Sequence, residues 1–167
     1  MSRAGSGSLV GMSTESAEPV VVEVEEVVAA VVAGVVPMGE LPTFFDRSFN
    51  AIAHAVAEQG RTITGPAYAR YHGPLGETAD LEVGFPTDAP VSPVGDVRPG
   101  GLPAATVARA IHTGSYEQLG TSWGELAQWM STQGHTPGSD IWEVYLTEPT
   151  PDVDPADLRT QLNWVVT

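Results

Sequence analysis

The order of apolar and polar positions predicts several strands. Valine dominates residues 20–36 and at first alternates with glutamate, and a break or bulge is expected near Ala29-Ala30 or Gly34. Runs of β-branched and aromatic residues predict further strands at 62–72, with a break at Gly65-Pro66, and at 80–85, 104–112, 141–147 and 162–166. Glycine and proline predict a hairpin turn at 73–76, and Pro149 is expected to end the strand at 141–147.

Two stretches have the period of an amphipathic helix. The first follows Pro42, and its apolar positions are Phe45, Phe49, Ile52 and Val56. The apolar positions of the second are Tyr116, Leu119, Trp123, Leu126 and Met130. Ser115 is expected to cap the second helix in a capping box with Gln118, and the glycines of Gln59-Gly60 and Gln133-Gly134 are expected to end the two helices.

The second half of the chain repeats the first at an offset of 74 residues. Phe49 corresponds to Trp123, Ile52 to Leu126 and Tyr71 to Tyr145. This repeat predicts an α+β fold made of a duplicated β-α-β-β unit, with half-repeats at about residues 19–90 and 91–167. We expect the two units to pair about a pseudo-twofold axis into one antiparallel sheet with two helices, leaving a central ligand groove between them.

Two segments are expected to lie outside regular elements. Residues 1–18 are rich in glycine and serine and are interpreted as a flexible leader or tag ahead of a single domain at 19–167. Residues 86–103 are rich in proline and glycine and are interpreted as a loop, with a short strand at Val91, Val94 and Val97 as the alternative.

The excess of acidic over basic side chains limits the classes of molecule that the protein can bind. The chain carries 7 basic and 21 acidic side chains, a net charge of −14, and such a field repels phosphate backbones. We therefore expect no direct binding to nucleic acid. Glutamates interrupt the apolar run at 20–36, so no membrane-spanning segment is expected. The absence of cysteine excludes disulfides and thiolate metal sites and suits a cytoplasmic protein.

No residue pattern indicates a metal site or another cofactor. The histidines His54, His72, His112 and His135 are scattered, without the spacing of metal ligands. The acidic group of Asp152, Asp154 and Asp157 lacks the full pattern of a calcium loop, and a solvated acidic loop is expected there.

Glu143 is the one carboxylate inside the apolar strand predicted at 141–147. Alternation along a strand places Ile141, Glu143 and Tyr145 on one face and Trp142 on the other. A carboxylate beside a tyrosine can anchor a ligand, whereas on a half-exposed sheet it would face solvent. The residue spacing alone favours a Glu143 that faces solvent over one that anchors a ligand.

Three segments together carry a family resemblance. They are His112-Thr-Gly-Ser-Tyr116-Glu-Gln-Leu119, the helix through Trp123 and Trp129 to Gly134, and Glu143-Val-Tyr145-Leu-Thr147-Glu-Pro149. The pattern resembles the GyrI-like small-molecule-binding domain over residues 20–167 and is strongest from Ala105 onward. That family includes effector-binding domains of multidrug-responsive regulators and standalone gyrase-inhibitory proteins. The resemblance implies a duplicated β-α-β-β fold.

The resemblance also implies a site. The family's characteristic carboxylate lies at the position matched by Glu143, at the base of an aromatic-lined pocket. A carboxylate among aromatic rings favours lipophilic, planar aromatic or cationic small molecules through ion pairing and cation–π contact. The candidate ligand-binding residues are Glu143, Tyr145, Tyr71, Trp123, Phe49, Tyr68 and Trp164, and ordinary core packing is the alternative for the aromatic ones. The regulators' helix-turn-helix module has no counterpart here, so DNA binding is not expected.

Other functions stay open beside the sequestration or sensing of toxic compounds. Some members of the family open the strained cyclopropane of DNA-alkylating natural products, which implies a hydrolase in which Glu143 activates water and Tyr145 or Tyr71 donates to the substrate. A gyrase-inhibitory protein would bind a protein partner such as gyrase through its acidic surface. A homodimer through the exposed sheet face or edge is a further alternative.

Overall fold

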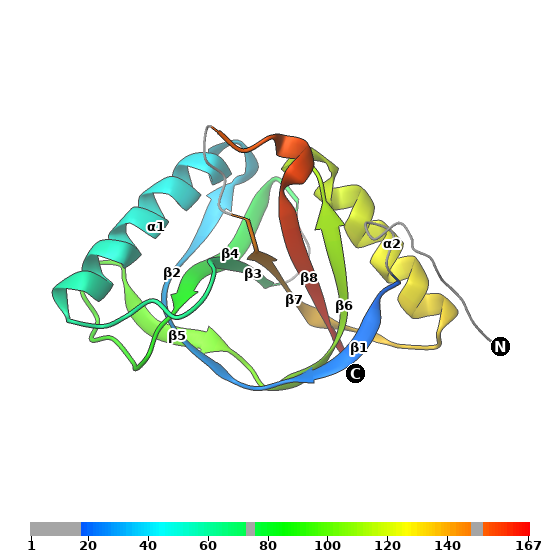
Figure 1. The fold of residues 1–167 in the computed structure, drawn as a ribbon, viewed down its shortest axis with the longest axis horizontal. Helices are drawn as coiled ribbons and strands as arrows, with labels where there is room; N and C mark the ends of the chain where they lie inside the picture. The colour runs from blue at the N-terminus through cyan, green and yellow to red at the C-terminus, as the bar shows by residue number, and fades with distance from the viewer. Residues whose placement is uncertain (1–17, 73–75, 148–151) are drawn as a thin grey trace.

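A computed structural model describes residues 18–72, 76–147 and 152–167 of the chain. The strands in these ranges are β1 (Val20–Val24), β2 (Val27–Pro37), β3 (Tyr68–His72), β4 (Thr78–Pro86), β5 (Arg98–Leu102), β6 (Ala105–Thr113), β7 (Pro137–Tyr145) and β8 (Arg159–Val166). The helices are α1 (Leu41–Glu58) and α2 (Leu119–Thr132), with 3-10 turns η2 (Met38–Glu40), η3 (Tyr116–Gln118) and η4 (Pro155–Asp157). Figure 1 shows the helices on either flank of a curled sheet.

The sheet is antiparallel and has the strand order β1-β6-β8-β7-β3-β4-β2-β5. β3 and β7 pair at its centre, and the units β2-α1-β3-β4 and β6-α2-β7-β8 extend from them in opposite directions. The predicted α+β fold with a duplicated β-α-β-β unit is therefore confirmed. Each unit is preceded by one more strand, and this leading strand pairs with the other unit: β1 with β6, and β5 with β2.

The leading strands join the two ends of the sheet. Two residues separate β1 from β2, and two separate β5 from β6. Val24 pairs with Ala105 and Val27 with Leu102, so one register continues across both gaps. The segments β1-β2 and β5-β6 therefore form one long antiparallel ribbon, here called the closing ribbon, which crosses the lower part of Figure 1. Closure gives the sheet an inner face, opposite the face on which the helices lie.

Side-chain alternation on β3 and β7 divides the core between these two faces. Tyr71 and Tyr145 pack with residues of α1 on the helix face, whereas Tyr68 and Trp142 pack with residues of the closing ribbon on the inner face. The apolar stripes of the helices are buried at Ile52, Val56, Leu126 and Met130, as their spacing predicts. Burial of each such side chain contributes about 2 kcal/mol, so the two helices are held firmly against the sheet.

Three expectations about the strands need correction. The break in residues 20–36 lies at Glu25-Glu26 rather than at Ala29-Ala30 or Gly34, because the chain there changes its pairing partner from β6 to β5. Only the last part of residues 62–72 is a strand, since Gly65-Pro66 interrupts the run. The segment 86–103, for which the sequence predicts a loop, contains the strand β5 at residues 98–102. This strand forms although its Pro-Gly-Gly sequence lacks strand formers.

The start of the second helix also differs from the prediction. Ser115 precedes the 3-10 turn η3 and makes no side-chain capping bond, while its carbonyl oxygen lies 2.9 Å from Nε2 of His112. The helix α2 itself begins at Leu119. The expected leader at 1–18 and the turn at 73–76 lie mostly outside the described residues. The strand predicted at 141–147 ends earlier than expected, at Tyr145, and Pro149 itself lies outside the described residues. No helix in the described ranges is long and apolar enough to cross a membrane.

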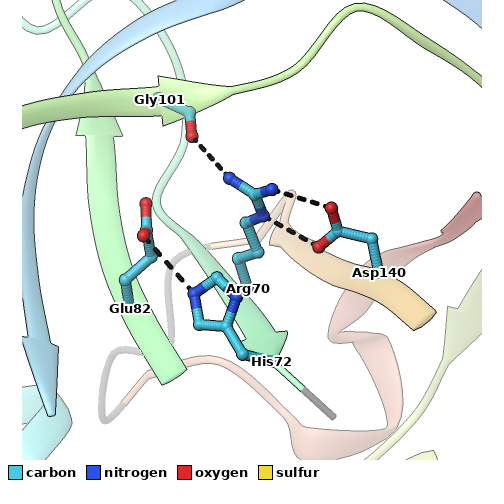
Figure 2. A network of polar contacts seen from close by, with 5 residues as sticks. All are labelled: Arg70, His72, Glu82, Gly101 and Asp140. Carbon is cyan, nitrogen blue, oxygen red and sulfur yellow. Dashed lines mark hydrogen bonds and ion pairs between the residues drawn. The ribbon is translucent and has the colours of Figure 1, made fainter. Parts of the chain in front are cut away.

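A polar network ties the central strands to the closing ribbon (Figure 2). Arg70 of β3 donates from Nε and Nη2 to the two carboxylate oxygens of Asp140 on β7, at 2.9 and 2.7 Å. Its Nη1 donates to the carbonyl oxygen of Gly101 on β5 at 3.3 Å. A bidentate pair fixes the guanidinium plane, so Arg70 holds three strands in one geometry.

Candidate functional site

A groove lies on the helix face where the two halves meet. Its cavity has a volume of about 920 Å³, which lies within the usual range for small-molecule sites. The aromatic residues that line it are Phe45, Phe49, Tyr71, Phe85, Tyr116, Trp123, Tyr145 and Trp164. Among the described residues, its lining also contains the carboxylates of Asp46 and Glu143 and no basic side chain.

The aromatic walls follow the internal repeat. Phe49 on α1 meets Phe85 on β4 edge-on, with ring centroids 5.3 Å apart. Their counterparts Trp123 on α2 and Trp164 on β8 meet in the same way at 5.7 Å. These edge-to-face contacts lock each helix aromatic against the sheet, so both walls are formed before any ligand arrives.

Glu143 lies at the centre of the groove floor. It pairs across the sheet with Ala69, its equivalent in the first repeat, which is fully buried in the core and does not line the groove. Glu143 is 5% exposed, and its two oxygens each accept one hydrogen bond: Oε2 from Nε1 of Trp123 and Oε1 from the hydroxyl of Tyr145, both at 2.8 Å. No described basic group lies within 4.0 Å of it. The carboxylate is thus oriented by neutral donors and forms no ion pair among the described residues, although the more distant His112 interacts with its charge.

Burial dominates the electrostatics of this carboxylate. Removal from water raises the pKa of Glu143. Hydrogen bonds from Trp123, Tyr145 and Tyr71 and the charge interaction with His112 oppose that rise only in part. Burial and the nearby Glu143 charge also raise the pKa of Tyr71 and of Tyr145. Both phenols therefore keep their protons at neutral pH, and the group that can ionise on the groove floor is Glu143.

Replacement of Trp123 by Phe is expected to raise the pKa of Glu143 further, because one of the two donors to its carboxylate is lost. The pKa should be measured by ¹³C NMR of the side-chain carboxyl group across a pH series. Trp129→Phe is the matched control, since Trp129 is on the same helix but stacks on His135 away from the groove. A Glu143 titration that is the same in both variants would contradict the assigned role of the indole.

The structure brings together six of the seven residues predicted for the site. Glu143, Tyr145, Tyr71, Trp123, Phe49 and Trp164 all line the groove. Tyr68 does not, and this is a correction: it is three residues from Tyr71 on one strand, so its side chain points to the inner face. Sequence reasoning missed Phe45, Phe85, Tyr116 and Asp46. The helical period at Phe45 and Tyr116 was a usable signal for two of them.

His112 positions the start of α2. One ring nitrogen lies 2.6 Å from Oγ of Ser122 and the other 2.9 Å from the carbonyl oxygen of Ser115, so the buried ring connects the end of β6 to two points near the helix start. Ser122 precedes Trp123 directly, and the contact therefore helps place the indole over Glu143. No group of three or more histidines or carboxylates in the described ranges has a metal-binding arrangement.

Comparison with known proteins agrees with this geometry. The model of a family described as GyrI-like small molecule binding domain matches residues 17–165. A comparison with curated protein sequences found no match. The crystal structure of the EcmrR C-terminal domain is 21% identical with a TM-score of 0.80, covering 90% of this chain and 97% of that chain. In its DNA complex EcmrR is a longer protein, of which this chain spans 57%.

Two further structures share the fold at lower identity. SAV2435 bound to tetraphenylphosphonium is 12% identical with a TM-score of 0.64, covering 90% of this chain and 94% of that chain. A hydrolase from Listeria innocua is 15% identical with a TM-score of 0.63, covering 90% of this chain and 92% of that chain. At these identities the similarity establishes the fold alone.

Proposed function

This chain belongs to the GyrI-like small-molecule-binding family, and we propose that its groove binds lipophilic, planar aromatic or cationic compounds. Sequestration or sensing of toxic compounds would be the use of such binding. The single observation that carries the proposal is the environment of Glu143: a buried carboxylate, held by two neutral donors, with aromatic walls around it and no described basic partner.

A cation satisfies this site in two ways. It supplies the counter-charge that Glu143 lacks, in surroundings where ion pairing is stronger than in water. The faces of Tyr and Trp rings add cation–π attraction. The groove has few polar side chains to impose a hydrogen-bond pattern, so shape and charge would decide the choice of ligand. Asp46, exposed at the rim on α1, adds a second negative charge that favours cations on entry.

Tetraphenylphosphonium is a suitable probe, since it is the ligand seen with SAV2435. Tetraphenylborate has nearly the same shape and the opposite charge, which makes it the matched control. Isothermal titration calorimetry should show binding of the cation and at least tenfold weaker binding of the anion, because Glu143 would repel the latter. Equal affinities would exclude the carboxylate as the recognition element, and the absence of binding by both compounds would contradict a site of this size and class.

The affinity for tetraphenylphosphonium is expected to rise with pH. The raised pKa of Glu143 means that part of the groove population is protonated and neutral at mildly acidic pH. A cation binds the ionised form, so affinity falls as pH drops through that pKa, and binding at such pH releases protons into the buffer. Calorimetry in buffers of different ionisation enthalpy measures this release. A pH-independent affinity would contradict the prediction.

The stability of the free protein should have the opposite pH dependence. The carboxyl of Glu143 holds its proton more tightly in the folded chain than in the unfolded chain. Its contribution to the free energy of unfolding is therefore present below the pKa of the unfolded chain and is lost as pH rises through the folded-state pKa. A bound cation would restore that loss, so the ligand should stabilise the protein most at the higher end of this window.

Hydrolysis of a reactive aromatic compound is the second candidate function. The observation that favours it is that burial raises the pKa of Glu143, which brings a carboxylate towards the range of an effective general base. Glu143 would activate a water molecule, and the protonated phenol of Tyr145 or Tyr71 would donate to the substrate as charge develops on it. Mass spectrometry of a panel that includes cyclopropane-bearing alkylators separates the two functions: a hydrolase adds one water to its substrate, and a binding protein returns every compound unchanged.

A further inference from the structure

A second cavity lies behind the groove, on the inner face of the sheet. The same two central strands form its floor: Tyr68, Trp142 and Val144 line it, and they alternate with the groove residues of β3 and β7. Its volume is about 160 Å³, and its lining is mainly apolar. The two cavities are therefore separated by one layer of sheet and have walls of different chemistry.

Arg109 is the cation of this second cavity. It lies on β6, it is half-buried, and its Nε donates to Oδ1 of Asn163 at 2.8 Å. In the described part of the chain no carboxylate lies within 4.0 Å of its guanidinium, whose two terminal nitrogens make no hydrogen bond there. Burial lowers the pKa of Arg109, as expected for a cation that loses water without gaining an anion.

The hydrogen bonds of Asn163 leave donor groups of Arg109 and Gln161 free for a ligand. This residue is fully buried: its carbonyl oxygen accepts from Arg109, and its amide nitrogen donates to Oε1 of Gln161 at 3.2 Å. The amide group of Gln161 is thereby oriented with its NH₂ as the free end. Tyr68 adds a buried hydroxyl that has no partner within the described ranges. That hydroxyl is not accessible from the cavity, so the donors that border the space for a ligand's acceptors are those of Arg109 and Gln161.

We infer that this second cavity binds a small carboxylate with an apolar body of about one ring, its oxygens on Arg109 and Gln161 and its ring against Trp142 and Tyr68. The size limit follows from the volume, since a cavity of about 150 Å³ in another protein accommodates benzene. The aromatic compounds proposed for the groove are much larger. The two sites thus select opposite charges and different sizes on the two faces of one sheet.

Among the described residues, Glu25 is the one acidic side chain in the lining of this cavity. It is exposed, at the gap between β1 and β2, so water screens its charge more than that of the half-buried Arg109. It should oppose an anionic ligand weakly. The charges of Arg109 and Glu25 therefore give two complementary tests. Neutralising Arg109 should lower the affinity for an anion, and neutralising Glu25 should raise it.

Benzoate is the probe, and the tryptophan indole N–H signals report where it binds. In ¹H–¹⁵N NMR of the intact chain, benzoate should shift the signal of Trp142 and leave Trp123 and Trp164, which line the groove, unchanged. Arg109→Gln should weaken benzoate about tenfold, as the loss of a hydrogen bond to a charged group does. Glu25→Gln should strengthen it about twofold. Arg98→Gln, on the exposed start of β5, is the matched control and should leave the affinity unchanged.

Several outcomes would overturn the inference. They are an unshifted Trp142 at millimolar benzoate, shifts confined to Trp123 and Trp164, an unchanged affinity in Arg109→Gln, or a preference for benzylamine over benzoate. Glu25→Gln still tests the inference if Arg109→Gln folds poorly. Glu25 is exposed, so its replacement should not disturb the fold, and the expected result is a gain in benzoate affinity. This test is independent of the proposed function, because none of the three substituted residues lines the groove in which tetraphenylphosphonium is expected to bind.

Discussion

Glu143→Gln is expected to weaken tetraphenylphosphonium binding about 100-fold, or about 2.7 kcal/mol. The substitution removes the one buried charge that the described residues contribute to the groove lining, and it keeps the shape of the side chain. A glutamine can place its carbonyl oxygen towards the indole N–H of Trp123 and its NH₂ towards the hydroxyl oxygen of Tyr145. Because both contacts at 2.8 Å have a replacement, the fold should be preserved.

The control for this variant is Asp46→Asn, which neutralises the second carboxylate of the groove. Asp46 is exposed, so its loss should reduce the affinity by less than about fivefold. Discrimination between tetraphenylphosphonium and tetraphenylborate should disappear in Glu143→Gln and persist in Asp46→Asn. Calorimetry on the three proteins decides this, and equal losses in both variants would mean that overall charge, rather than the buried carboxylate, governs binding.

Gly101→Ala is expected to destabilise the protein by more than about 3 kcal/mol. Gly101 has a φ of 155°, and a Cβ added to it would lie 1.8 Å from the carbonyl oxygen of Val27. That overlap is with backbone of the paired strand, so no side chain can move to relieve it. The closing ribbon would have to separate at this point, and the contact from Arg70 to the Gly101 carbonyl would be lost with it.

A second glycine in the chain gives the matched control. Gly124 lies inside α2 on the exposed side, and nothing lies within 4 Å of the Cβ position. Gly124→Ala should therefore stabilise the protein by about 0.5 to 1 kcal/mol, because alanine restricts the unfolded chain and favours helix. Urea unfolding measures both changes. A Gly101→Ala protein as stable as the wild type would show that the ribbon does not close as described.

The parts of the fold that follow local periodicity were predictable from the sequence. The helix α1 ends at Glu58, just before the predicted Gln59-Gly60 stop, and α2 ends at Thr132, just before the stop at Gln133-Gly134. The repeat-equivalent pairs Tyr71 and Tyr145, and Phe49 and Trp123, all line the same groove, because equivalent residues of a duplicated unit occupy equivalent positions about its axis. Alternation also placed Glu143 and Tyr145 on one face, and the same rule would have excluded Tyr68.

The closing ribbon could not be predicted in this way. β5 has the sequence Arg98-Pro-Gly-Gly-Leu102, which lacks both β-branched residues and alternation. It is a strand because β2 offers it a free edge, and that pairing joins residues about 70 positions apart in the chain. The break at Glu25-Glu26 has the same origin. Long-range pairing also creates the second cavity, so neither its volume nor the isolation of Arg109 leaves a local pattern in the sequence.

The pairing of Glu143 with Ala69 brings two equivalent positions of the repeat together at the centre of the sheet, and the two halves differ there. Two identical half-length chains associated about the same axis would put the same residue at both positions. They would carry two adjacent carboxylates that share a proton, or two alanines and no charge at all. A homodimer of identical halves therefore cannot place a single anion at the centre, whereas one polypeptide can, because each of its halves can diverge independently. A single chain thus allows a twofold scaffold to carry one charge at its centre.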